Sequence, residues 1–165
     1  MPARFRLLLV LLLAATASQP AFALLGETVG DIKKRLGPPE MQMEKNKESA
    51  YWLFEGDDGQ LMYSVTFNAQ GKSIAEGLKP LKRARFNKTR VLEFIDSELI
   101  LIRNSPTLRT VKPGEAYKFA GHEFKCAETE YIVVDEKNDT LIMWTQAGVP
   151  NVLVLSAEML HRMVN

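Results

Sequence analysis

The sequence predicts an α+β domain, an antiparallel sheet with short helices on one side. Residues 61–67 alternate apolar and polar side chains, which is typical of a strand with one covered face. Residues 140–145 and 152–156 are short and largely apolar, as central strands are. Apolar residues recur at helical spacing in only a few short stretches. This pattern is compatible with one sheet or with two smaller ones.

The first 23 residues read as a cleavable secretory signal. Arg4 and Arg6 supply its positive start, and residues 7–17 form an uncharged apolar run. Ala21-Phe22-Ala23 then places small residues where signal peptidase needs them, so we expect cleavage between Ala23 and Leu24. A retained anchor is the alternative, but a run of about a dozen residues is short against the ~20 that span a bilayer.

The expected mature chain is soluble and nearly neutral. No cysteine follows the apolar run and no later segment could span a membrane, so we expect neither a lipid anchor nor a second span. The whole chain has 21 basic and 20 acidic residues, and loss of Arg4 and Arg6 leaves 19 basic ones. This balance gives no general attraction to nucleic acid. We therefore expect an exported protein, either periplasmic or extracellular.

Residues 24–80 are predicted to form a helix followed by a three-stranded meander. Thr28 suits a helix N-cap, with Asp31 placed to complete a capping box. Ile32 and Leu36 would form the apolar stripe, and Gly37 would end the helix. Residues 41–49 read as a loop. The predicted strands and turns then follow in order: strand 50–55, turn 56–59, strand 61–67, turn 68–71 and a weaker strand 72–78.

Residues 81–165 are predicted to form a second unit that packs with the first as one domain. A helix should begin near Asn87 or Thr89, but residues 99–102 are apolar on all sides and could be helix or strand. Residues 104–113 read as a loop. The remaining predicted elements are strands 116–119, 123–127, 130–135, 140–145 and 152–156, with a hairpin tip at 137–139 and a final helix over 157–163.

The segment Thr28 to Pro39 resembles the helix motif of the SmpA/OmlA (BamE) family of small outer-membrane assembly lipoproteins. The matching residues are Thr28, Ile32, Leu36, Gly37 and Pro39. The resemblance covers about a third of the mature chain and implies a helix-plus-meander fold. The chain is also similar in outline to the β-lactamase inhibitory protein, which has tandem units of this kind. It lacks the family's lipidated cysteine, and no functional residue carries over from either group.

No catalytic, cofactor or metal site is expected. On one strand His122 and Cys126 would lie about 13 Å apart, too far for a nucleophile–base pair, so we expect a buried thiol. His161 has no ligand-like spacing to either residue. The acidic clusters at 57–58 and 135–139 do not match a calcium loop and suit turns better. No acidic residue is singled out as a general acid or base.

A basic connector is the most distinctive charged feature. Its six positive side chains are Lys79, Lys82, Arg83, Arg85, Lys88 and Arg90. They could bind an anionic envelope component or an acidic protein, or they could simply keep a linker solvated. Asn87-Lys88-Thr89 and Asn138-Asp139-Thr140 are glycosylation sequons by pattern.

These observations favour a non-enzymatic envelope or secreted protein that binds another protein or an anionic envelope component. An inhibitor of an extracellular enzyme is the first alternative. A small hydrolase whose site is built from scattered residues is the second.

Overall fold

The computed structural model describes residues 24–42, 48–56, 59–81, 88–145 and 151–164. The helices in these ranges are α1 (Val29–Leu36), α2 (Lys88–Ile102) and α3 (Ala157–Val164). The strands are β1 (Met41–Gln42), β2 (Ser49–Gly56), β3 (Gly59–Phe67), β4 (Ser73–Pro80), β5 (Leu108–Val111), β6 (Ala116–Phe119), β7 (His122–Lys125), β8 (Glu130–Asp135), β9 (Thr140–Thr145) and β10 (Asn151–Ser156).

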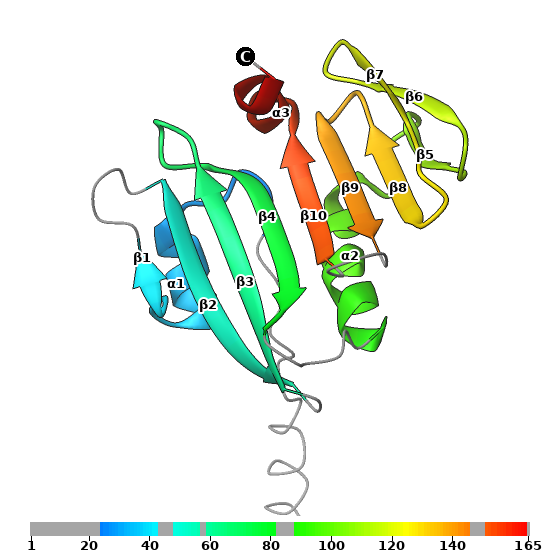
Figure 1. The fold of residues 1–165 in the computed structure, drawn as a ribbon. Coiled ribbons are helices and arrows are strands. Elements are labelled where there is room, and N and C mark those ends of the chain that lie inside the picture. The colour runs from blue at the N-terminus through cyan, green and yellow to red at the C-terminus, as the bar shows by residue number, and fades with distance from the viewer. Residues whose placement is uncertain (1–23, 43–47, 57–58, 82–87, 146–150, 165) are drawn as a thin grey trace, which may run out of the picture.

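One large antiparallel sheet organises the described chain (Figure 1). Its eight strands run in the order β1-β2-β3-β4-β10-β9-β8-β5, and β6 with β7 forms a separate two-stranded sheet. The two halves of the sequence meet where β4 pairs with β10, from Ala75 opposite Leu155 to Leu78 opposite Val152. The predicted α+β class is confirmed, and the choice between one main sheet and two is settled in favour of one.

Helix α1 begins and ends as its capping residues predict. Thr28 Oγ1 accepts a hydrogen bond from the Asp31 amide, and Asp31 accepts one from the Thr28 amide, which completes the capping box. Gly37 ends the helix at φ 82°, a conformation that favours glycine. Trp52 Nε1 of β2 donates to the Gly37 carbonyl at 3.1 Å. The helix end is therefore tied directly to the sheet.

Helices α1 and α2 cover one face of the sheet and lie behind it in the view of Figure 1. Ile32 of α1 and Val91 and Phe94 of α2 are each 0% exposed. They pack in one cluster with inward-facing residues of the strands, among them Tyr63 and Val154. Residues 99–102, which could have been strand, belong to α2. Their apolar character fits a helix end partly packed against this cluster.

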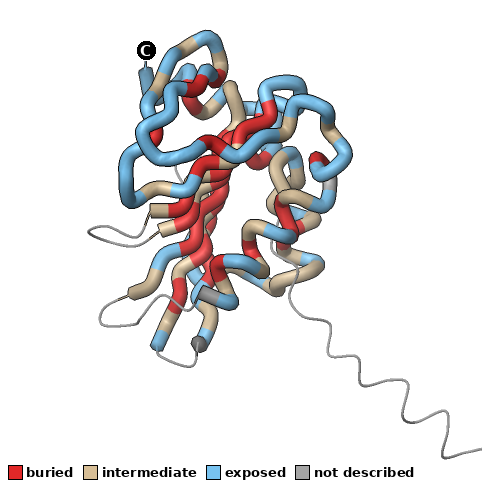
Figure 2. Tube along the Cα trace, turned by 90° about the vertical axis from the view of Figure 1, so that its right-hand side faces the viewer, coloured by how far each residue is buried: buried red, intermediate tan, exposed pale blue. Residues whose placement is uncertain are grey.

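The β6–β7 hairpin and α3 cover the opposite face, but only over the second half of the sheet. Tyr117 and Phe119 of β6 and Leu160 of α3 share a buried cluster with Val134 and Leu141 of the sheet. In Figure 2 the buried residues run along the strands between these two layers of cover. The first half of this face has no such cover among the described elements.

Three local predictions need correction. Residues 104–113 were expected to be loop but contain β5, which pairs with β8 at the sheet edge. An edge strand with exposed Arg109 and Thr110 lacks the alternating pattern that reveals strands. Residues 41–42, expected as loop, form β1. Strand β4 was expected to be weak, yet residues 73–78 are all buried because β4 is the central junction of the sheet.

Candidate functional site

The uncovered part of the sheet is a half-exposed surface made of side chains from five strands. Cross-strand partners point to the same face, so the strand pairings define its central row. That row runs Met41, Tyr51, Ser64, Gly77 and Leu153. A second row contains Leu53, Met62 and Lys79. We call these eight residues the open face.

The open face carries apolar side chains where solvent can reach them. Met41 is 60% exposed and Leu53 is 37% exposed, while Tyr51, Met62 and Leu153 are half-buried. A groove of about 300 Å³ lies over the face. Tyr51, Met62 and Leu153 line this groove, whereas Met41 and Leu53 lie outside its lining. Apolar side chains that gather on one accessible face mark contact surfaces more often than scattered ones do.

Gly77 forms the floor of this groove. A Cβ built on Gly77 would come within 3.0 Å of Leu153 Cδ2 and 3.1 Å of Ser64 Oγ, so a larger residue would crowd both neighbours. Gly77 adds no side chain to the groove, and the side chains of Ser64 on β3 and Leu153 on β10 flank this position.

Only part of the basic connector can be placed beside this groove. Lys79 is exposed and lines it, which gives the groove a positively charged edge. Arg90 lies on α2 and pairs with Glu93 at 2.9 Å, so it is not an open anchor for an anion. Lys82, Arg83 and Arg85 fall outside the described residues, as does the side chain of Lys88. The predicted patch therefore stays a prediction apart from Lys79 and Arg90.

Two buried carboxyl groups lie beneath the helices. Glu76 of β4 is 1% exposed and Glu98 of α2 is 4% exposed. Tyr63 donates a 2.6 Å hydrogen bond to Glu76 Oε2, whereas Oε1 of Glu76 and Oε1 of Glu98 have no donor among the described residues. A proton held between the two carboxyl groups would satisfy one orphaned oxygen of each.

The pKa values of the pair agree with a bound proton at neutral pH. Burial raises the pKa of Glu76 to about 7, although hydrogen bonds from Tyr63 and Ser73 lower it in part. Burial and the neighbouring charge of Glu76 raise the pKa of Glu98 well above its usual range. Both carboxyl groups therefore hold a proton more readily than an exposed glutamate does.

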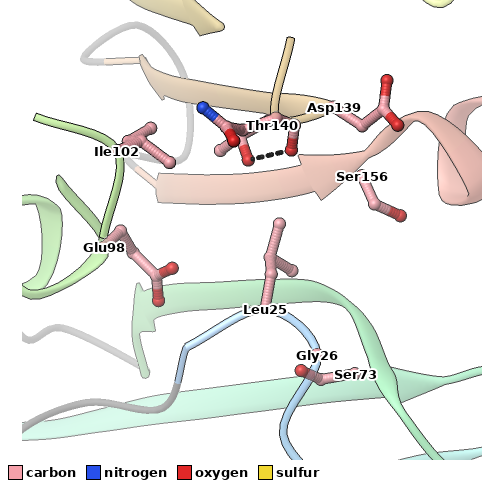
Figure 3. A pocket seen from close by; sticks show the side chains of 9 residues that line it. Leu25, Gly26, Ser73, Glu98, Ile102, Asp139, Thr140 and Ser156 are labelled. Atoms are coloured by element: carbon pink, nitrogen blue, oxygen red, sulfur yellow. Dashed lines mark hydrogen bonds between the residues drawn. The ribbon is translucent and has the colours of Figure 1, made fainter. Parts of the chain in front are cut away.

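Glu98 also borders a pocket of about 290 Å³ at the seam of the two halves (Figure 3). Leu25 and Gly26 come from the N-terminal segment, Ser73 from β4 and Ser156 from β10. Glu76 does not line this pocket. A ligand in the pocket could meet one carboxyl group but not the pair.

Sequence reasoning did not single out this pair, although the sequence held a signal for it. Glu76 lies between Ile74-Ala75 and Gly77-Leu78, and Glu98 is followed by four apolar residues. A lone acidic residue in such a run is either exposed or expensive to bury. Only the packing of α2 on the sheet shows that the carboxyl groups of Glu76 and Glu98 lie next to each other.

Cys126 is buried, as the sequence predicted. It is 1% exposed, and burial raises the pKa of its thiol. It follows β7, while His122 lies at the start of β7 and stacks edge-on with His161 of α3, their ring centroids 5.9 Å apart. The two histidines, distant in sequence, thus meet each other. The Cys126 thiol instead lies 3.6 Å from the carbonyl oxygens of Ala127 and Glu130.

The acidic cluster at 135–139 shapes a turn. Asp135 accepts hydrogen bonds from Ser105 at 3.0 Å and from Asn138 Nδ2 at 2.7 Å, and Asp139 has φ 49°. The other acidic pair, at 57–58, lies outside the described residues. Within the part of the chain that the structure describes, no three His, Cys, Asp or Glu side chains gather closely enough to hold a metal ion. In the same ranges no helix is long and apolar enough to cross a bilayer.

Comparison with known proteins gives a distant likeness only. No protein-family model and no curated protein matches the sequence. One similar solved structure is a cysteine-rich secretory protein from Staphylococcus aureus subsp. aureus Mu50, at 14% identity and a TM-score of 0.45, covering 82% of this chain and 46% of that one.

A second is an extracellular protein containing an SCP domain from Bacillus anthracis str. Ames, at 13% identity and a TM-score of 0.44, covering 88% of this chain and 48% of that one. This chain spans about half the length of each. The resemblance to the SmpA/OmlA (BamE) family stays a prediction.

Proposed function

We propose that the mature chain is an exported, non-enzymatic module that binds another protein through the open face. The observation that supports this is the groove over Tyr51, Met62 and Leu153, half-exposed in an otherwise packed sheet. The secretory signal pattern in residues 1–23 supports export. The two proteins with similar structures are described as secretory and extracellular, respectively, but the likeness is too weak to add to the argument.

The chemistry of the groove defines the partner. Tyr51, Met62 and Leu153 in its lining would contact an apolar side chain. Lys79 at its edge would favour an acidic neighbour on the partner. A protein segment with an apolar anchor flanked by Asp or Glu meets both conditions. Residues of this kind, buried at the centre of an interface, supply most of its binding energy.

Photo-crosslinking tests the proposal. A photoreactive amino acid replaces Met62 on the open face, and in a control protein it replaces Ile100, an equally apolar residue of α2 that is 58% exposed. Cells expressing each protein are irradiated, and exported fractions are analysed by mass spectrometry. We expect one discrete adduct at Met62 that Ile100 does not give. Identical adduct patterns, or none at Met62, would overturn the proposal.

The same partner then tests the open face directly. Leu53→Asp places a negative charge on the open face and should weaken binding of the purified partner at least tenfold. Ile100→Asp is the matched control and should leave binding unchanged. Thermal melts of both variants establish that each is folded. If the partner is an extracellular enzyme whose activity falls on binding, the inhibitor alternative is correct.

A small hydrolase remains the second candidate, because two buried carboxyl groups with raised pKa values are also found in acid–base catalysts. Glu98 lines the seam pocket, but Glu76 does not, and Tyr63 holds Glu76 away from it. Hydrolysis of ester, amide or glycoside probes by the wild type, abolished in Glu98→Gln, would favour the hydrolase. Equal background rates in both proteins would exclude this carboxyl pair as its site.

A further inference from the structure

The segment immediately after the predicted cleavage point is held firmly on the sheet. Ser73 Oγ donates to the Leu24 carbonyl at 3.1 Å, and the Gly26 amide donates to the Ser73 carbonyl at 2.9 Å. The Ser73 amide in turn donates to the Glu27 carbonyl at 2.8 Å. Residues 24–27 thus lie alongside the start of β4 and are hydrogen-bonded to it. Leu25 and Gly26 line the pocket that Glu98 borders.

The backbone nitrogen of Leu24 points at a carboxylate. It lies 3.0 Å from Glu27 Oε2, and the same oxygen accepts from Arg35 of α1. The Glu27 side chain is 26% exposed and that of Arg35 is 24% exposed. This partly buried pair is screened less than an exposed surface pair would be.

Cleavage changes the chemistry of that nitrogen without moving it. Before cleavage it is the uncharged amide of the Ala23–Leu24 bond and can donate one hydrogen bond. Hydrolysis of that bond by one water leaves a carboxylate on Ala23 and an amino group on Leu24, which is protonated at neutral pH. The hydrogen bond to the Glu27 carboxylate, in which only the acceptor was charged, then becomes an ion pair in which both partners are charged.

The new charge would also act on its surroundings. Glu27 accepts the hydrogen bond of this nitrogen, and Arg35 donates to the same Glu27 oxygen. The next residue, Leu25, makes a backbone hydrogen bond to Glu98 of α2. Glu27 raises the pKa values of both buried carboxyl groups through its negative charge. The ammonium group of Leu24, next to Glu27, would partly cancel this negative charge and so reduce the rise in both pKa values.

We propose that signal removal creates a structural cation, in which the α-ammonium group of Leu24 pairs with Glu27 and fastens residues 24–27 over the Glu98 pocket. The mature chain is therefore more stable than any form that carries residues before Leu24. The inference rests on the proposed export in one respect: signal cleavage during export is what would produce the free amino group of Leu24. A precursor without this ion pair opens its N-terminal segment more easily.

The test compares three N-termini on otherwise identical folded protein: a free amino group on Leu24, an acetylated Leu24, and a chain that retains Ala23. Thermal melts at pH 6.5 should place the free Leu24 form about 2–5 °C above the other two, as expected for one partly buried ion pair in a domain of this size. At pH 9.5 the amino group loses its proton and the three forms should converge. Equal melting temperatures at pH 6.5 would overturn the proposal.

A charge-specific variant separates the ion pair from simple blocking of the terminus. Glu27→Gln keeps an oxygen that can accept from Leu24 but removes its charge, so acetylation should have no further effect in this background. Glu40→Gln, at an exposed position near α1, is the control and should retain the full difference. An acetylation effect that persists in Glu27→Gln would contradict the ion pair. N-terminal sequencing of native exported protein tests export separately. A start at Met1 would show that the signal is not cleaved, without bearing on whether a free Leu24 amino group pairs with Glu27.

Discussion

Tyr63 donates a 2.6 Å hydrogen bond to Glu76, and neither side chain is more than 1% exposed. The bond lies on the face covered by the helices, where β3 and β4 pass beneath α2. Because Glu76 in turn faces Glu98, one buried polar chain connects the first half of the fold to the helix that begins the second. The protonation state of Glu76 and Glu98 should therefore affect the free energy of unfolding.

Stability should fall as pH rises from 5 to 8. Glu76 has a pKa of about 7 in the folded protein, against the ordinary glutamate value of 4.5 in the unfolded chain, so the folded state binds more protons in this window. A group with a raised folded pKa stabilises fully below its unfolded pKa and loses that contribution as pH rises through the folded one. The loss is on the order of 3 kcal/mol for Glu76. Melting temperatures measured at half-unit steps would show it.

Glu76→Gln identifies the source of this pH dependence. It removes the carboxyl group whose pKa is raised to about 7, so the stability of the variant should depend less on pH between 5 and 8 than that of the wild type. Glu136→Gln, at an exposed position, should behave as the wild type does. Asp31 and Asp135 do not interfere, because their lowered pKa values keep them ionised throughout this window. A flat wild-type profile would contradict a buried carboxyl pair.

Tyr63→Phe should cost about 1–3 kcal/mol, because it removes the donor from a buried carboxyl group. The cost should be larger at pH 8 than at pH 5, since the ionised form of Glu76 needs that donor most. Urea unfolding at the two pH values measures both costs. Tyr131→Phe is the control: Tyr131 is 54% exposed, and its loss of a hydroxyl should change stability little.

The first helix should respond to changes in capping and packing. Ile32→Ala should cost about 2–5 kcal/mol, more than Leu36→Ala, because Ile32 is 0% exposed whereas Leu36 is half-buried. Gly37→Val should also destabilise, since φ 82° strains a β-branched residue. Thermal melts with Lys34→Ala as the exposed control decide this. Wild-type melting of Ile32→Ala and Gly37→Val would mean that α1 is not docked.

Cys126 should react slowly with a bulky maleimide in the native protein, because its thiol is 1% exposed. Cys126→Ser should cost about 1–3 kcal/mol through a buried hydroxyl. It should leave partner binding intact, since Cys126 lies under the β6–β7 hairpin and not on the open face. Labelling as fast as that of an unfolded control would contradict this placement.

Local features were predictable from the sequence because their causes lie within a few residues. The capping box of Thr28 and Asp31 and the turn at Gly37 set the bounds of α1, and alternation predicted β3. Strands 130–135 and 140–145 were predicted with the bounds that the structure gives them, since a tight turn joins them. The edge strand β5 was not predicted from the sequence, because it has little apolar surface to bury and so lacks an alternating pattern.

Tertiary structure alone decided the features on which the proposed binding function depends. The pairing of β4 with β10 joins strands about 75 residues apart, and no local pattern specifies that partner. This pairing creates the groove by setting Gly77 beside Leu153. The packing of α2 on the sheet likewise buries Glu98 beside Glu76. Composition and periodicity fix which residues each element buries, but the chemistry of a site depends on which elements meet, and that is set by long-range packing.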